Sequence, residues 1–184
     1  MTERSPSPRE EHQSSIAVVV GNPKQRSRTL TVADTVARSV AEAVGLPAAD
    51  FRTVDLAEYG SELFDWSSVR VAEAVAAVRS SSLAVIASPT YKASYTGLLK
   101  SFLDWFSSTD LVGVTVVPLM VGAGLQHALA VEVHLRPVLV ELGATLPTRG
   151  LYVTEGQLEE LDDVVSGWLD EAAPRLVAAL RPQG

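Results

Sequence analysis

A stretch near the start of the sequence, GNPKQRSRT (21–29), combines hydroxyl and cationic side chains between an apolar run and a helix-period segment. The first turn of a helix has unpaired N–H groups and a partial positive charge, so it attracts anions. Ser27 and Thr29 can add hydroxyl donors, and Arg26 or Arg28 can add charge-assisted bonds. A phosphate monoester is the expected ligand. The same pattern also fits a simple helix cap at Ser27 with solvated cations beside it.

Two further loops carry residues that suit a flat aromatic ligand. In SPTYKASYTG (88–97), Pro89 fixes the backbone and Tyr91 offers a flat apolar face with a polar tip. The alternative interpretation is that Tyr91 and Tyr95 are ordinary half-buried aromatic residues. In VGAG (121–124), two glycines would let the backbone approach a ligand closely, although glycines also serve any tight turn.

The composition excludes several other kinds of site. The chain has 184 residues and a net charge of −7, which argues against nucleic acid as a main partner. It contains no cysteine, so disulfide scaffolds, thiolate nucleophiles and Cys-ligated metals are excluded. His127 and His134 would lie about 10.5 Å apart on one helix, too far to share a metal, so we expect no metal site.

No apolar run reaches the roughly 20 residues that cross a bilayer, and the N-terminal residues lack the apolar core of a signal peptide. We therefore expect a cytoplasmic protein without a membrane partner. The polar, Pro- and Ser-rich residues 1–15 are expected to form a disordered tail, and residues 16–184 a single domain.

Apolar runs alternate with helix-period segments along the rest of the chain. A continuous β-branched run such as IAVVV (16–20) is typical of a strand buried on both faces. The strands are expected at 16–20, 51–56, 83–87, 112–120 and 151–153, and the helices at 27–44, 67–79, 95–106, 125–142 and 157–180, with a kink at Pro137 and an interruption at Pro174.

Five successive β-α units imply a parallel sheet with helices on both faces. The usual arrangement of five such strands is the order 2-1-3-4-5, which gives a flavodoxin-like three-layer α/β sandwich. In such a sheet, ligands bind beyond the carboxyl ends of the strands where the strand order reverses. The three loops follow the first, third and fourth strands, so we expect them to form one crevice. Its phosphate end and flat-ring end suit FMN better than a dinucleotide, because only one phosphate-type loop is present.

These motifs resemble those of the NAD(P)H-dependent FMN reductases. SPTYKASYTGLLKSFLDW (88–105) is similar to the family signature. GNPKQRSRT matches the first loop, G-S-P-x-x-x-S-R-T, of the reductase partners of two-component alkanesulfonate monooxygenases. PLMVGAGLQHALAVEVHLRPVLVELGA (118–144) resembles their PL-x-x-GG-x-x-H-x-L-A-x-x-x-x-LRPVL pattern. The similarity extends from about residue 16 to residue 157.

The resemblance implies an NAD(P)H:FMN oxidoreductase in which NADPH or NADH gives a hydride to flavin N5. No side chain is strictly required for that chemistry, so we expect no catalytic residue. Reduced FMN would then pass to a partner flavin-dependent monooxygenase. The implied FMN-binding residues are Ser27, Arg28 and Thr29 at the phosphate, with Gly21, Asn22 and Arg26 in the same loop; Pro89, Thr90, Tyr91 and Lys92 along the ring and ribityl chain; and Gly122, Ala123 and Gly124 on the other side of the ring.

The chain departs from the family pattern at three places. Asn22 stands where the family usually has Ser, and Ala123 replaces the second glycine of GG. Val133 stands where the alkanesulfonate group carries a Tyr that widens one helical turn. Two other functions fit the fold: an FMN-bound quinone, azo or metal-oxyanion reductase, and a non-enzymatic flavodoxin-type electron carrier. The carrier would need a T/S-x-T-G-x-T loop, which is absent. A response-regulator domain would need an acidic pocket, for which only Asp55 is available.

Apolar residues occupy more than one face of the expected helices 95–107 and 125–142. A helix that packs on a sheet needs only one apolar stripe. The surplus predicts a subunit interface, and the resemblance implies a homodimer or homotetramer.

Overall fold

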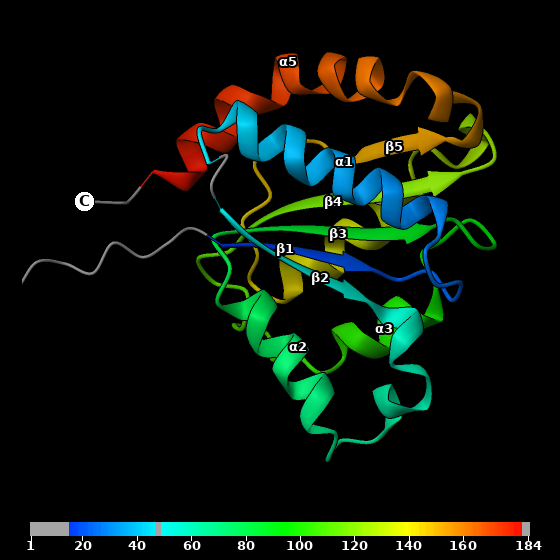
Figure 1. The fold of residues 1–184 in the computed structure, drawn as a ribbon, viewed down its shortest axis with the longest axis vertical. Coiled ribbons are helices and arrows are strands. Elements are labelled where there is room, and N and C mark those ends of the chain that lie inside the picture. Colours follow the sequence, from blue (N-terminus) through cyan, green and yellow to red (C-terminus); the bar gives the residue numbers. More distant parts are fainter. Residues whose placement is uncertain (1–14, 47–48, 182–184) are drawn as a thin grey trace, which may run out of the picture.

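The computed structural model describes residues 15–46 and 49–181, and a five-stranded parallel sheet lies at its centre (Figure 1). The strand order is β2-β1-β3-β4-β5, which confirms the predicted topology. The predicted tail lies outside the described residues except for Ser15, which is the first residue of β1. The strands are β1 Ser15–Val20, β2 Asp50–Asp55, β3 Leu83–Pro89, β4 Thr115–Gly122 and β5 Leu151–Thr154.

In the described part of the chain, five α-helices cover the two faces of the sheet and complete the three predicted layers. Helices α1 and α5 pack on one face, and α2, α3 and α4 pack on the other (Figure 1). Successive side chains of β1 point to opposite faces of the sheet. Ile16, Val18 and Val20 face α1 and α5, whereas Ala17 and Val19 face the opposite layer. The helices are α1 Arg28–Ala43, α2 Val69–Arg79, α3 Gly97–Leu103, α4 Arg136–Glu141 and α5 Leu161–Leu180.

The central strands are apolar at successive positions because both of their faces are covered. Every residue of β3 and β4 is buried, as is every residue of β1 after Ser15. The edge strand β2 exposes its first half. Hydroxyl side chains cap three of the helices and fix where they begin: Ser27 caps α1, Ser68 caps α2 and Thr96 caps α3.

The prediction of one long helix over 125–142 is wrong. The segment consists of a 3-10 turn at Leu125–His127, a π-helix at Val131–Leu135, and then α4. Pro137 is the second residue of α4, just after the π-helix, so its missing N–H falls where the helical hydrogen-bond pattern changes. The kink at Pro137 stays a prediction. The widened turn is present with Val133, and not a tyrosine, at its centre.

A side-chain clasp connects this π-helix to the segment that precedes β5. Glu132 accepts hydrogen bonds from the Gly150 N–H at 2.5 Å and from Arg136 Nε at 2.5 Å. Arg136 in turn donates to the carbonyl oxygens of Leu146, at 3.2 Å, and Thr148. These contacts hold the irregular turn against residues 10 to 18 positions away in the sequence.

The interruption expected at Pro174 is absent, since α5 continues through it to Leu180. Pro174 is exposed, and the carbonyl of exposed Asp170 that it leaves without a helical donor can be solvated. The helix also begins later than predicted, because Glu155–Glu160 forms a 3-10 turn. Among the described residues, no helix has the length and apolar character needed to cross a bilayer.

Two glycines provide a test of this packing. A Cβ on Gly21, at the end of β1, would lie 2.5 Å from Leu99 Cβ on α3, whereas a Cβ on Gly167 in α5 would meet nothing within 4 Å. We expect Gly21→Ala to lower the free energy of unfolding by about 1–3 kcal/mol through overpacking. Gly167→Ala should raise the free energy of unfolding by about 0.5–1 kcal/mol, because alanine lowers the conformational entropy of the unfolded chain. Urea unfolding checks both values, and equal effects of the two substitutions would contradict the described α3–β1 contact.

Candidate functional site

The three loops predicted to form one crevice do meet at one edge of the sheet. The strands are parallel, and β1, β3 and β4 are neighbours, so their carboxyl ends emerge side by side. The Gly21 N–H donates to the Ala87 carbonyl at 2.8 Å, and the Thr90 N–H donates to the Val121 carbonyl at 2.7 Å. These two bonds hold the beginnings of the loops in register with the sheet.

The first loop presents two buried hydroxyl groups at the start of α1. Ser27 Oγ accepts the Leu30 N–H at 3.2 Å, and Thr29 Oγ1 accepts Asn22 Nδ2 at 3.0 Å. Each oxygen therefore has a donor from the protein, and its own hydrogen can be given to an anion. Ser27 is 4% exposed and Thr29 is 2% exposed. The first turn of a helix also has N–H groups without helical acceptors, and the anion site expected here stays a prediction.

The amide at position 22 takes over part of the loop's internal support. Asn22 is buried, and its Oδ1 accepts the Lys24 N–H at 2.9 Å while its Nδ2 donates to Thr29. The Asn22 amide has two hydrogens, so it can donate one to Thr29 and still has one left. A serine at this position has a single hydrogen, which the bond to Thr29 would use up.

The cations of the first loop differ in their contacts. Arg28 forms an ion pair with Glu155 at 3.0 Å, which joins the start of α1 to the turn after β5. Arg26 and Lys24 are exposed. The Arg26 backbone is left-handed, with φ of 48°, and its N–H donates to Asp55 Oδ2 at 3.3 Å. The contribution of the Arg28 side chain to phosphate binding stays a prediction.

The second loop makes a tight reverse turn over residues 91–94. The N–H and carbonyl groups of Tyr91 and Ser94 are paired at 2.8 and 3.1 Å. Lys92 and Ala93 between them have φ of 51° and 65°, as in a type I′ turn. Left-handed backbone is disfavoured for residues with a Cβ, and such strain concentrates at functional sites. The turn leaves Tyr91 half exposed, at 50%. Its contact with a ligand stays a prediction.

A buried hydroxyl without a partner lies between the second and third loops. Thr90 Oγ1 is buried and makes no hydrogen bond to the described residues. It lies near Gly122, where an added Cβ would be 3.1 Å from it. An unpaired buried hydroxyl is costly, so a polar group of a ligand would supply the missing partner.

The glycine at 122 has a structural reason that the sequence did not indicate. A Cβ there would lie 2.0 Å from the Tyr152 hydroxyl oxygen, and Tyr152 Oη donates to the Gly124 carbonyl at 3.0 Å. Tyr152 on β5 therefore packs directly against the third loop and fixes it. Ala123 is exposed beside this contact. The position of Tyr152 in a short strand carried no signal of this role.

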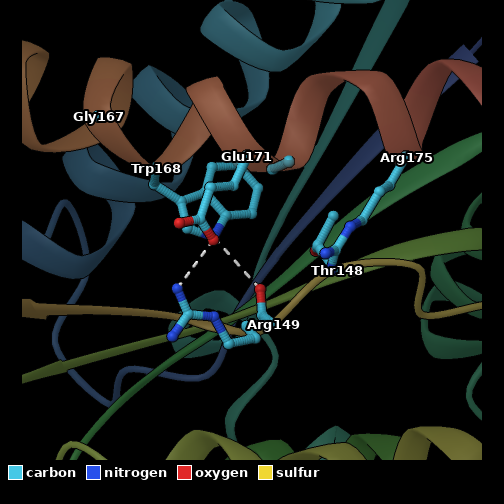
Figure 2. A pocket seen from close by; sticks show the side chains of 7 residues that line it. Thr148, Arg149, Gly167, Trp168, Glu171 and Arg175 are labelled. Atoms are coloured by element: carbon cyan, nitrogen blue, oxygen red, sulfur yellow. Dashed lines mark hydrogen bonds and ion pairs between the residues drawn. The ribbon is translucent and has the colours of Figure 1, made fainter.

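A separate hollow lies near the opposite edge of the sheet (Figure 2). It has a volume of about 70 Å³, and Thr148 and Arg149, which precede β5, face residues of α5 across it. Arg149 forms an ion pair with Glu171 at 3.0 Å, and the Trp168 indole N–H donates to the Arg149 carbonyl at 3.3 Å. None of the predicted site residues lines this cavity.

Comparison with known proteins places the chain in a family. The model of the NADPH-dependent FMN reductases matches residues 14–158, a segment that contains all three loops. The chain belongs to the NADPH-dependent FMN reductase family. The resemblance found in the sequence motifs is thereby confirmed.

Several bacterial family members are similar to this chain over different lengths. The FMN reductase (NADPH) of Escherichia coli K12 is 39% identical over 74 residues, which is 40% of this chain and 39% of that protein. The NADH-dependent FMN reductase SfnF of Pseudomonas putida is 37% identical over 78 residues, 42% of each protein. These two matches thus span about two fifths of their relatives. The FMN reductase (NADPH) of Pseudomonas aeruginosa is 28% identical over 78% of each protein.

Among solved structures, the apo form of the NADH:FMN oxidoreductase EMOB has a TM-score of 0.79 and 30% identity, and the similarity covers 92% of this chain and 91% of that one. An oxidoreductase of Corynebacterium diphtheriae has a TM-score of 0.75 and 25% identity, over 91% of this chain and 97% of the other. The fold of this family member is therefore shared over nearly its whole described length.

Among the described residues of this family member, two buried hydroxyl groups without a hydrogen-bond partner allow a matched test. Thr90 Oγ1 lies near Gly122 between the second and third loops, and Thr148 Oγ1 is its counterpart beside the distant hollow. Removing either hydroxyl with an isosteric Val should raise the free energy of unfolding of the flavin-free protein by about 1 kcal/mol. Only Thr90→Val should weaken FMN binding, by about five- to tenfold. Flavin titration measures this, and unchanged FMN affinity in Thr90→Val would rule out a ligand contact at that hydroxyl.

Proposed function

We propose that this chain is an NAD(P)H:FMN oxidoreductase that accepts hydride from NADPH or NADH onto FMN bound at the carboxyl edge of the sheet. The observation that carries the proposal is the start of α1, where two buried hydroxyls have internal donors and keep their own hydrogens for an anion. Bound FMN would supply the redox chemistry, with flavin N5 as the hydride acceptor.

The first loop would hold the phosphate of FMN. Ser27 and Thr29 donate their hydroxyl hydrogens, and the N–H groups of the first turn of α1 add partial positive charge. Gly21, Asn22 and Arg26 shape the loop around that position, and Arg28 adds its backbone N–H from the first helical residue.

The second and third loops would hold the ring and the ribityl chain. Pro89 and the 91–94 turn support one side, and Thr90 offers its free hydroxyl to a polar edge of the flavin. The segment of Gly122, Ala123 and Gly124, fixed by Tyr152, lines the other side. Tyr91 and Lys92 border the open face, where the nicotinamide would stack and where water must be excluded during hydride transfer.

We further propose that the protein is cytoplasmic and that reduced FMN leaves it for a partner flavin-dependent monooxygenase, as the resemblance implies. The alternatives keep FMN bound, either to reduce quinones, azo dyes or metal oxyanions, or to carry electrons without catalysis. Structural likeness to a quinone reductase of Klebsiella pneumoniae, at 10% identity, and to the azoreductase AzrA, at 14%, shows the fold alone.

Anaerobic stopped-flow measurement separates these functions. Mixing the protein with FMN and NADPH or NADH should bleach the flavin absorbance at a rate that saturates with nucleotide. Steady-state oxidation of the nucleotide should require added FMN, because the reduced flavin is released. Tightly copurified FMN with turnover independent of added flavin would favour the quinone, azo or oxyanion reductase. Failure of both nucleotides to bleach the flavin would leave only the electron carrier.

We also propose that the chain assembles as a homodimer or homotetramer through the α3 and π-helix–α4 region. A hollow of about 440 Å³ lies between these elements, and Leu103, Phe106 and Leu142 contribute apolar walls. The neighbouring segment exposes apolar side chains, with Leu129 72% and Val140 57% exposed. Apolar surface of this kind is typical of a subunit interface.

A pair of exposed valines tests the interface. Val140 on α4 is 57% exposed and Val69 on α2 is 70% exposed. A glutamate at Val140 would bury a charge in the assembly, so Val140→Glu should convert the dimer or tetramer to monomers. Val69→Glu should leave the mass unchanged. Size-exclusion chromatography with light scattering measures the masses, and a monomeric unsubstituted protein would contradict the proposal.

A further inference from the structure

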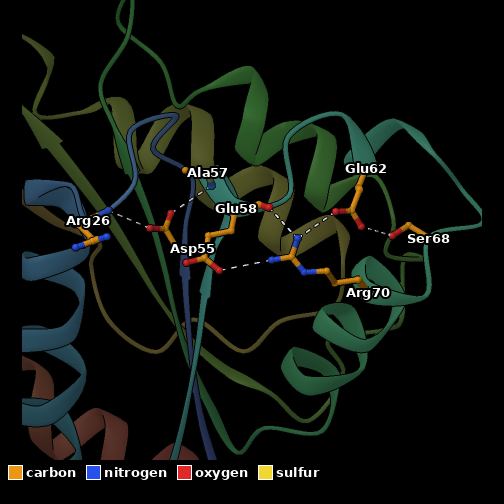
Figure 3. Close-up of polar contacts among 7 residues, drawn as sticks. All are labelled: Arg26, Asp55, Ala57, Glu58, Glu62, Ser68 and Arg70. Atoms are coloured by element: carbon orange, nitrogen blue, oxygen red, sulfur yellow. Dashed lines mark hydrogen bonds and ion pairs between the residues drawn. The ribbon is translucent and has the colours of Figure 1, made fainter.

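A buried carboxylate lies at the end of β2, directly behind the first loop of the site (Figure 3). Asp55 is 7% exposed, and each of its oxygens accepts a backbone N–H. Oδ2 accepts from Arg26 at 3.3 Å, and Oδ1 accepts from Ala57 at 3.3 Å. One side chain therefore joins the turn after β2 to a loop that is 29 residues earlier in the sequence.

The Arg26 bond acts at the most strained point of the first loop. Arg26 has a left-handed backbone, with φ of 48°, a conformation that side chains with a Cβ disfavour. Its N–H is held by Asp55, and the next residue is Ser27, the cap of α1. The direction in which the chain enters α1 therefore depends on this turn, and so do the positions of the hydroxyls of Ser27 and Thr29.

The other polar contacts after β2 do not reach the first loop (Figure 3). Arg70 contacts Glu62 at 3.1 Å and Glu58 at 3.5 Å, and Glu62 accepts from Ser68 at 3.0 Å. These contacts connect the turn after β2 to α2. Among the contacts drawn, only that of Asp55 reaches Arg26.

We propose that Asp55 is a positioning residue that sets selectivity for phosphorylated flavin, an inference that rests on the proposed FMN site. By holding Arg26, its carboxylate keeps the hydroxyls of Ser27 and Thr29 and the first N–H groups of α1 directed at the phosphate. Asp55 does not touch the flavin. Its loss should therefore weaken FMN, which has the phosphate, and spare riboflavin, which shares the ring and ribityl chain but lacks the phosphate.

The test compares two aspartates of the same segment. Asp65 accepts the N–H of Ser67 at 3.0 Å, just as Asp55 accepts that of Ala57. Asp65 is exposed, however, and among the described residues it makes no hydrogen bond or ion pair with the first loop. Hydrogen bonds from the Ser67 side chain and backbone lower the pKa of Asp65, so it carries a negative charge at neutral pH. Asp65→Ala thus removes a similar cap and charge away from the site.

Flavin titrations on the full chain should give three results. Asp55→Ala should weaken FMN binding about tenfold and change riboflavin binding less than twofold. Asp55→Asn should recover part of the FMN affinity, because its amide oxygen can accept the Arg26 N–H. Asp65→Ala should change neither affinity. In turnover, the KM for FMN should rise in Asp55→Ala while kcat stays near that of the unsubstituted protein.

Several outcomes would overturn the proposal. Equal loss of FMN and riboflavin binding would mean that Asp55 only supports the fold, and unchanged or tighter FMN binding would mean that it does not position the loop. If Asp55→Ala fails to fold by circular dichroism, the same comparison is made with Asp55→Asn. A wrong assignment of the FMN site would give another result, because the unsubstituted protein would then not bind FMN in preference to riboflavin.

Discussion

The hydrogen bond from Thr96 Oγ1 to the Gly21 carbonyl oxygen, at 2.5 Å, is the contact on which the geometry of the site depends. It joins the cap of α3 to the end of β1, and therefore joins the second loop to the first. Leu99 packs so closely over Gly21 that no Cβ fits between them. Ser88 at the end of β3 also holds Thr96, since its Oγ accepts the Thr96 N–H at 3.0 Å. The distance between the proposed phosphate end and ring end is thus set by buried contacts rather than by flexible loops.

This rigid junction supports strained backbone on both sides. Among the described residues, the non-glycine positions with left-handed backbone are Arg26, Lys92 and Ala93, and all three lie in the first and second loops. Such conformations persist only where surrounding contacts hold them. Asp55 holds the first, and the paired N–H and carbonyl groups of Tyr91 and Ser94 hold the other two. Loops that are held by such contacts favour ligand binding, because less ordering remains for binding to achieve.

Much of the fold could be predicted from local sequence. Continuous apolar runs identified the buried strands, since β1, β3 and β4 are covered on both faces. The succession of β-α units then led to the strand order. Ser27 was recognisable as a helix cap because capping depends on the residues next to it. The loops of the site could be located because the topology alone brings them to one edge.

The features that sequence reasoning missed depend on tertiary contacts. The π-helix is joined through Glu132 and Arg136 to residues 146–150, and no local pattern marks that clasp. Tyr152 reaches Gly124 from the edge strand, and Asp55 reaches Arg26 from the end of β2. Pro174 was expected to interrupt a helix by propensity, but α5 continues through it. Pro174 and Asp170, whose carbonyl loses its helical donor, are both exposed residues. In the 125–142 segment and at Pro174, tertiary packing and solvation outweigh local helix propensity.

A crystal structure of the protein with FMN would locate both ends of the flavin. We expect the phosphate within hydrogen-bond distance of the Ser27 and Thr29 hydroxyl oxygens, at the start of α1, with the flavin ring extending toward Thr90 and the 91–94 turn. A phosphate bound elsewhere, for example beside Arg149 and Arg175 in the hollow at the opposite edge of the sheet, would contradict it.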